Sequence, residues 1–232
     1  MNAASKRIKL VLFDIDGTLV STGGAGTRSM SLAFEELFGI PNGFAGLTMA
    51  GRTDPAIIRD GFSRHGLDSG DGHYARYEAA YLRHLEREIF SSPNRRVMPG
   101  IVEILTALDG SHITVGLLTG NMEAGARIKL QAMGLWHYFM LGAYGSDNDD
   151  RNRLLGVAMR RYERQHGKQI EPQEVIVVGD TPKDIECSKP FGALSVAVAT
   201  GPYKSEELAA HAPDHLFDDL SGTESFLKIV RP

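Results

Sequence analysis

The chain has 232 residues, of which 42% are hydrophobic and 23% charged, so its composition is that of a folded globular protein and excludes general disorder. The net charge of −4 and the scattered lysines and arginines leave no basic stripe for nucleic acid. Cys187 is the only cysteine, which excludes an intrachain disulfide, and no apolar run has the length of a signal peptide or a membrane span. We therefore expect a cytoplasmic monomer or homodimer without a nucleic-acid or membrane partner.

The first predicted element is a buried strand that ends at two carboxylates. The apolar run Leu10–Phe13 leads into Asp14 and Asp16, whose side chains project from the same side because a strand alternates its faces. Two like charges that close repel each other unless a cation or a shared proton lies between them, which favours a metal site or an acid/base pair. The alternative is an Asx turn at Asp16-Gly17-Thr18, and the residues alone do not separate the two.

Residues 20–96 follow a helical pattern, with no convincing strand. Apolar positions at spacings of three and four predict a helix over 29–38 that stops at Gly39, and Pro55 begins a helical stretch that runs to about residue 90. Glycines 23, 24 and 26 on one side and Pro99-Gly100 on the other are plausible hinges. We interpret 20–96 as an all-helical domain inserted after strand one.

After residue 99 short apolar runs alternate with helical segments. The strands expected are 113–118, 175–178, 194–198 and, more weakly, 139–143; the helices are 100–109, 122–134, 151–166 and 182–191. This alternation predicts an α/β fold, a Rossmann-like three-layer core with a central, mainly parallel sheet, formed by residues 1–19 and 97–232.

Polar residues close three of the predicted strands. Besides the first pair, one strand ends in Thr119-Gly120-Asn121, and another is followed by Asp180 and Asp184. Ligands of open parallel sheets collect at the carboxyl ends of the strands, and oxygen ligands without histidine favour a hard cation such as Mg²⁺. Each motif alone has a structural alternative, a helix cap or a turn, but their joint placement favours a catalytic site.

These motifs, Asp-x-Asp-Gly-Thr, Thr-Gly-Asn and Gly-Asp-x-x-x-Asp, occur in the order found in the haloacid dehalogenase superfamily, which the chain resembles. The resemblance implies that Asp14 is the nucleophile and Asp16 the general acid/base. It also implies that Mg²⁺ is held by Asp14, Asp180 and the backbone carbonyl of Asp16, with Asp184 as an outer or supporting residue. Thr119 and the amides after it, including Gly120 and Asn121, would bind phosphoryl oxygens.

The chain departs from the family at the expected lysine, because residues 146–154 contain none. We assign the cationic role to Arg151, which opens a predicted helix and can clamp a phosphate. The alternative for Arg151 is a surface ion pair. Lys129 is the competing cation, but its distance along the preceding helix is expected to carry it away from the crevice.

The helical insertion resembles the family's smaller cap, which closes over the substrate. Arg52 and Thr53 in Gly51-Arg52-Thr53-Asp54 are candidates for binding a substrate carboxylate or second phosphate, with helix capping by Thr53 or Asp54 as the equal alternative. Tyrosines 74, 77 and 81 recur at helical spacing and are expected to form a packed face.

Together these features predict a Mg²⁺-dependent phosphatase for a small phosphorylated metabolite, either a phosphoglycolate-like acid or a sugar phosphate. A mutase that resembles β-phosphoglucomutase would use the same residues, and a noncatalytic binding or regulatory module is the alternative that the absent lysine suggests.

Overall fold

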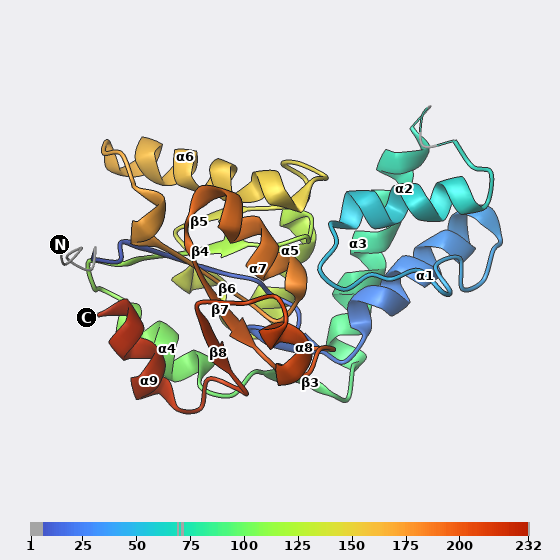
Figure 1. Ribbon diagram of the computed structural model, residues 1–232. Coiled ribbons are helices and arrows are strands. Elements are labelled where there is room, and N and C mark those ends of the chain that lie inside the picture. The colour runs from blue at the N-terminus through green and yellow to red at the C-terminus, as the bar shows by residue number, and fades with distance from the viewer. Residues whose placement is uncertain (1–6, 69, 71, 232) are drawn as a thin grey trace.

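The computed structural model describes residues 7–68, 70 and 72–231. Its centre is a six-stranded parallel sheet with the strand order β5-β4-β1-β6-β7-β8. The strands are β1 (Leu10–Phe13), β4 (Thr114–Leu118), β5 (Leu141–Ala143), β6 (Val175–Gly179), β7 (Leu194–Val198) and β8 (His215–Phe217). Figure 1 shows this sheet inside one half of the molecule, with three helices of the other half set apart from it. The predicted α/β fold is confirmed.

Helices cover both faces of the sheet, and the alternation of β1 explains how they attach. Val11 and Phe13 point to the face that packs on α4, α5 and α9, whereas Leu10 and Leu12 point to the face that packs on α6 and α7. The helix bounds are α4 (Ile101–Leu108), α5 (Glu123–Ala132), α6 (Leu154–His166), α7 (Pro182–Ser188) and α9 (Thr223–Val230). A strand that is apolar on both faces belongs at the centre of a three-layer core, which is where β1 lies.

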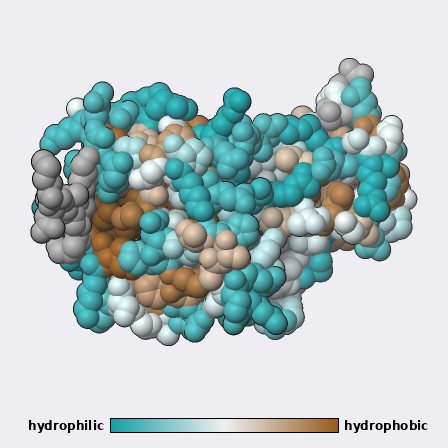
Figure 2. Space-filling view, viewed as in Figure 1, coloured by the Kyte–Doolittle hydropathy of each residue, from teal (hydrophilic) through white to brown (hydrophobic). Residues whose placement is uncertain are grey.

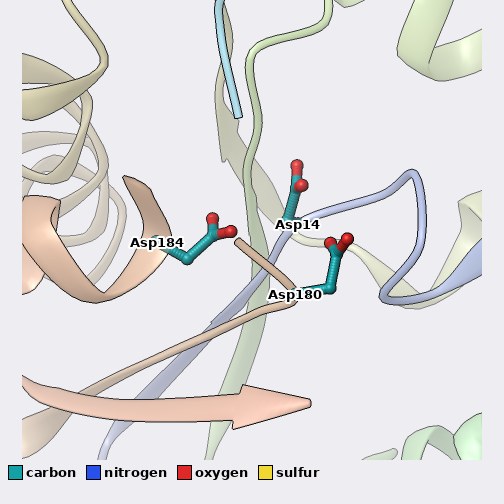
Figure 3. Close-up of side chains that lie close together, drawn as sticks. All are labelled: Asp14, Asp180 and Asp184. Carbon is teal, nitrogen blue, oxygen red and sulfur yellow. The ribbon is translucent and has the colours of Figure 1, made fainter. Parts of the chain in front are cut away.

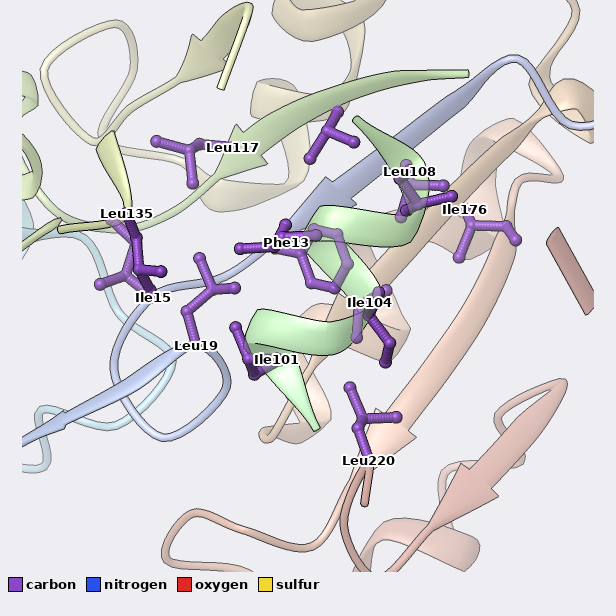
Figure 4. Close-up of a cluster of buried hydrophobic side chains, with 14 of the residues drawn as sticks. Phe13, Ile15, Leu19, Ile101, Ile104, Leu108, Leu117, Leu135, Ile176 and Leu220 are labelled. Atoms are coloured by element: carbon purple, nitrogen blue, oxygen red, sulfur yellow. The ribbon is translucent and has the colours of Figure 1, made fainter. Parts of the chain in front are cut away.

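The larger core fixes the register of the central strands. Phe13 lies at its centre, among side chains of α4 and the neighbouring strands (Figure 4). It is level with Leu117 of β4 and Val178 of β6. The residues that follow these three positions therefore leave the sheet at one edge, which places the polar strand ends side by side.

Three helices that follow β1 form a separate helical unit, which we call the cap. It contains α1 (Ala25–Phe38), α2 (Asp54–Arg64) and α3 (His73–Ser91), which bury their own aromatic core, centred on Phe34, Phe62 and Tyr77. Met122 of the core half packs into the same cluster. The cap therefore rests on the region where α5 begins.

The expectation of no strand between 20 and 96 is wrong. β2 (Val20–Thr22) and β3 (Arg95–Val97) pair antiparallel where the chain enters and leaves the cap. Each strand has three residues, and apart from one bridge between Val20 and Asp16 the two strands pair with each other. Neither therefore carries the apolar run or the long alternation by which a strand is recognised in a sequence.

The remaining elements are short: α8 (Ser205–Ala209) and the 3-10 turns η1 (Trp136–Tyr138), η2 (Arg151–Arg153), η3 (Pro172–Glu174) and η4 (Lys189–Phe191). None of the helices in the described ranges combines the length and apolar character needed to cross a bilayer. On the face seen in Figure 2, hydrophilic residues predominate, and hydrophobic ones gather on the core half at the end away from the cap.

Candidate active site

Three buried carboxylates meet at the edge of the sheet where β1 and β6 end. Asp14 follows β1, Asp180 follows β6, and Asp184 lies in the first turn of α7 (Figure 3). Each offers a carboxylate oxygen within 4.8 Å of the others. Three acids so close together and out of water need positive charge nearby.

Asp14 is 5% exposed, and burial raises the pKa of its carboxyl to about 6. Arg151 and a hydrogen bond from Thr119 oppose this rise, whereas the charge of Asp184 adds to it. The backbone amide of Asp14 donates to the carbonyl of Val178 at 2.9 Å, which fixes the residue to the end of β6. Asp14 is therefore a rigidly held carboxylate that depends on its cationic surroundings to ionise.

Asp180 lies in a cradle of small residues. Thr18 Oγ1 donates to Asp180 Oδ1 at 2.8 Å, and burial with the charges of Asp14 and Asp184 raises the pKa of Asp180. Gly17 has a φ of +83°, and a Cβ added to Gly17 or to Gly201 would overlap Asp180 Oδ2. Only glycine permits both this turn and this approach.

Arg151 reaches the acids from η2, the turn before α6. It is 6% exposed, pairs with Asp184 Oδ1 through one guanidinium nitrogen, and has the same nitrogen 3.3 Å from Asp14 Oδ1. Asp184 Oδ2 is already bonded by the amide and the hydroxyl of Thr181, at 3.0 and 2.7 Å. Asp184 thus holds Arg151 in place, and Arg151 is not the surface ion pair that was the alternative.

Lys129 also lies in the site, so the expectation that α5 carries it away is wrong. Its Nζ donates to Asp16 Oδ2 at 2.5 Å and to Asn121 Oδ1 at 2.6 Å, and the residue is 4% exposed. Burial opposes its charge, but the carboxylates of Asp16 and Asp54 outweigh that effect and raise the pKa of Lys129. Side chains of a helix tilt toward its amino terminus, so a long lysine in the second turn reaches back to the strand edge.

The Thr-Gly-Asn loop mainly organises the site. Asn121 Nδ2 donates to Asp16 Oδ2 and to Thr119 Oγ1, both at 2.9 Å. The backbone amide of Asn121 also donates to Thr119 Oγ1, and that of Met122 donates to Asp54 Oδ2. Two of the amides that were expected to bind phosphoryl oxygens are therefore already bonded within the protein.

The cap loop contacts the core directly. Thr53 caps α2, because its hydroxyl accepts from the amide of Ala56 at 3.4 Å, and the same hydroxyl donates to the carbonyl of Asp149 at 2.8 Å. Thr53 does not line the cavity, whereas Arg52 does, with its guanidinium paired to Asp60 Oδ2 at 2.6 Å. A ligand that binds Arg52 has to share it with Asp60.

A cavity of about 380 Å³ lies between the cap and the strand ends, and Asp14, Asp16 and Asp180 line it. Its remaining wall includes residues that the sequence analysis did not assign to the site: Thr22, Gly26, Met30, Tyr81, Arg96 and Thr200. Thr200 Oγ1 donates to the carbonyl of Gly17 at 2.6 Å, which braces the turn after Asp16. These residues come from β2, β3, the cap helices and the loop after β7, and no motif links them in the sequence.

The family is decided by comparison with known proteins. Residues 11–198 match the model of the haloacid dehalogenase-like hydrolases. The chain belongs to this family. The hydrolase is 27% identical over 230 residues to the phosphoglycolate phosphatase of Rhodospirillum rubrum, with 97% of this chain and 92% of the relative covered.

Solved structures share the fold of this hydrolase. A predicted phosphoglycolate phosphatase from Haemophilus somnus has a TM-score of 0.73 at 18% identity, covering 97% of this chain and all of that one. CbbY from Rhodobacter sphaeroides, in complex with phosphate, has a TM-score of 0.71 at 17% identity, with 92% and 95% covered. The predicted family is confirmed.

The donor set fits a hard divalent cation. Asp14 and Asp180 line the cavity, whereas Asp184 does not and is occupied by Thr181 and Arg151. Asp14 and Asp180 offer only oxygen ligands to the cavity. Two such carboxylates suit an ion that keeps several of its waters. Within the buried cluster, Asp14 and Asp180 therefore face the cavity and Asp184 supports them.

Proposed function

We propose that this hydrolase is a Mg²⁺-dependent phosphatase that acts on a small phosphorylated metabolite through an aspartyl phosphate on Asp14. The observation that carries the proposal is the meeting of Asp14, Asp16 and Asp180 with two buried cations, Arg151 and Lys129, in one cavity. A cavity of about 380 Å³ suits a small molecule. The phosphatase relative supports the same reaction class.

In the first step Asp14 attacks phosphorus, a P–O bond to Asp14 forms, and the ester P–O bond breaks. Asp16 gives its proton to the departing alkoxide. In the second step Asp16 takes a proton from water, which attacks phosphorus and releases phosphate and the free Asp14 carboxylate. Asp16 is suited to this exchange because its side chain is 41% exposed, whereas that of Asp14 is 8% exposed.

The two cations have separate tasks. Arg151 contacts Asp14 and so reduces the repulsion between the nucleophile and the phosphoryl group. Lys129 and Asn121 hold the Asp16 carboxylate toward the cavity. When bound by Asp14, Asp180 and the Asp16 carbonyl, Mg²⁺ supplies further positive charge against the phosphate. Arg151 thus takes the task that the family usually gives to a lysine.

Phosphate release from 2-phosphoglycolate, glucose 1-phosphate and p-nitrophenyl phosphate tests the proposal. We expect turnover with Mg²⁺, none with EDTA, and none with Asp14→Asn, whereas the exposed Asp109→Asn serves as the matched control with wild-type rates. Quenching with acid during turnover should trap phosphate on the wild-type chain and not on Asp14→Asn. Turnover that survives Asp14→Asn, or that ignores EDTA, would refute the mechanism.

A further inference from the structure

Three tyrosines of α3 differ in how their hydroxyl groups are satisfied. The Tyr77 hydroxyl donates to the carbonyl of Met30 at 3.0 Å, and the Tyr74 hydroxyl donates to Met122 Sδ at 3.5 Å. The Tyr81 hydroxyl is buried and has no hydrogen-bond partner within the described ranges, and the residue is 0% exposed. A buried phenol is normally bonded, so an unbonded one points to a partner that arrives from outside.

Tyr81 belongs to the wall of the catalytic cavity. It lines the same cavity as Asp16 and Lys129, although it comes from the cap and they come from the core. Across from it, α5 has a glycine: a Cβ added to Gly125 would lie 3.5 Å from the Tyr81 hydroxyl oxygen. The hydroxyl therefore lies beside the first turn of α5, the helix that carries Lys129.

The surroundings keep this hydroxyl protonated. Burial raises the pKa of Tyr81, and the carboxylates of Asp54 and Asp16 raise it further. Tyr77 contributes to the same rise in pKa, and Lys129, which lines the cavity, is bonded to Asp16 and Asn121. A neutral phenol can donate one hydrogen bond and accept others, so it suits an uncharged or anionic oxygen.

We propose that Tyr81 is a specificity residue whose hydroxyl donates a hydrogen bond to an oxygen on the organic part of the substrate. This inference rests on the proposed phosphatase function. The phosphoryl group is expected beside Asp14 and Arg151 at the strand ends, so the cap side of the cavity faces the leaving group. The substrate class is then a short phosphomonoester with a carboxylate or hydroxyl group, in preference to a plain alkyl phosphate.

Three ligands of matched length test the inference: 2-phosphoglycolate, 2-hydroxyethyl phosphate and ethyl phosphate. For Tyr81→Phe we expect kcat/KM to fall about 10-fold with the ligand whose oxygen is bound, and to stay within about 2-fold with ethyl phosphate. A loss with 2-phosphoglycolate alone identifies a carboxylate, and a loss with both oxygenated ligands identifies any accepting oxygen. Tyr77→Phe, whose hydroxyl is bonded inside the cap, should change all three substrates by the same factor.

A binding measurement gives a readout that does not require turnover. In the Asp14→Asn background with Mg²⁺, calorimetry should show the same selective loss of affinity when Tyr81→Phe is added. Equal changes for all three ligands, or no change for any, would overturn the inference. If wild-type protein turns over no phosphoester while the selective binding loss persists, the proposed function fails and the role of Tyr81 in binding stands.

Discussion

Asp54 is a buried carboxylate that joins the cap to the core at an energetic cost. Its Oδ2 accepts from the amide of Met122 at 2.9 Å, and its own amide donates to the carbonyl of Gly120 at 2.7 Å. Burial raises the pKa of Asp54 to about 6, although Lys129 lowers it in part. The neutral Asp54→Asn keeps an oxygen that can accept from Met122 and removes the buried charge.

The sign and size of the effect follow from the two pKa values. An aspartate in an unfolded chain has a pKa of about 3.9, so between about pH 4 and pH 6 the folded carboxyl holds a proton that the unfolded one has released. The free energy of unfolding therefore falls as the pH rises through this window. Each pH unit between the two values is worth about 1.4 kcal/mol, so ionised Asp54 costs the folded protein about 3 kcal/mol above pH 6.

Urea unfolding in EDTA at pH 4 and pH 7.5 checks this expectation. Asp54→Asn should raise the free energy of unfolding by about 2 to 3 kcal/mol at pH 7.5 and by much less at pH 4. Asp60→Asn is the matched control, because Asp60 is on the same helix with a side chain that is 51% exposed, and surface changes stay within about 0.5 kcal/mol. An equal gain at both pH values, or a loss at pH 7.5, would refute the reasoning.

Two further predictions concern the cations and the thiol. Arg151→Met should lower kcat about 100-fold or more, because Asp14 loses its cationic neighbour. Arg151→Lys should recover part of that loss. Near-wild-type rates in Arg151→Met would show that Arg151 has no part in the mechanism. Burial raises the pKa of Cys187 to about 12. A disulfide reagent at pH 8 should therefore label the folded protein about 1000-fold more slowly than the protein unfolded in urea. Fast labelling of the folded protein would contradict a buried thiol.

The pattern of the sequence was sufficient for the α/β core and for the strand-end acids. β1, β4 and β6 are largely apolar, and polar residues follow each of them; a cap or a turn could explain each motif alone, but their joint placement favoured a site. Parallel strands end at one edge of a sheet, so the meeting of Asp14, Thr119 and Asp180 follows from topology alone. The cap helices were equally visible, because their apolar spacing is local.

Local sequence patterns did not predict the role of a side chain where that role depends on the length of the side chain or on a partner far away in the sequence. Because of its position along α5, Lys129 was expected to lie away from the active site. The backward tilt and the length of its side chain instead bring Nζ to Asp16. For the loop that holds Arg52 and Thr53, substrate binding and helix capping were equal alternatives. Only the structure shows that the Thr53 hydroxyl caps α2 and that Arg52 pairs with Asp60.

The sequence by itself determined the family, the fold class and the two aspartates at the end of the first strand, because those features depend on residue order and on the period of a strand. Tertiary structure decided which cations reach the acids, the separation of Asp184 from the cavity, and the burial of the Tyr81 hydroxyl without a partner among the described residues. Each of these depends on distances between residues far apart in the chain, which a hydrophobic pattern does not encode.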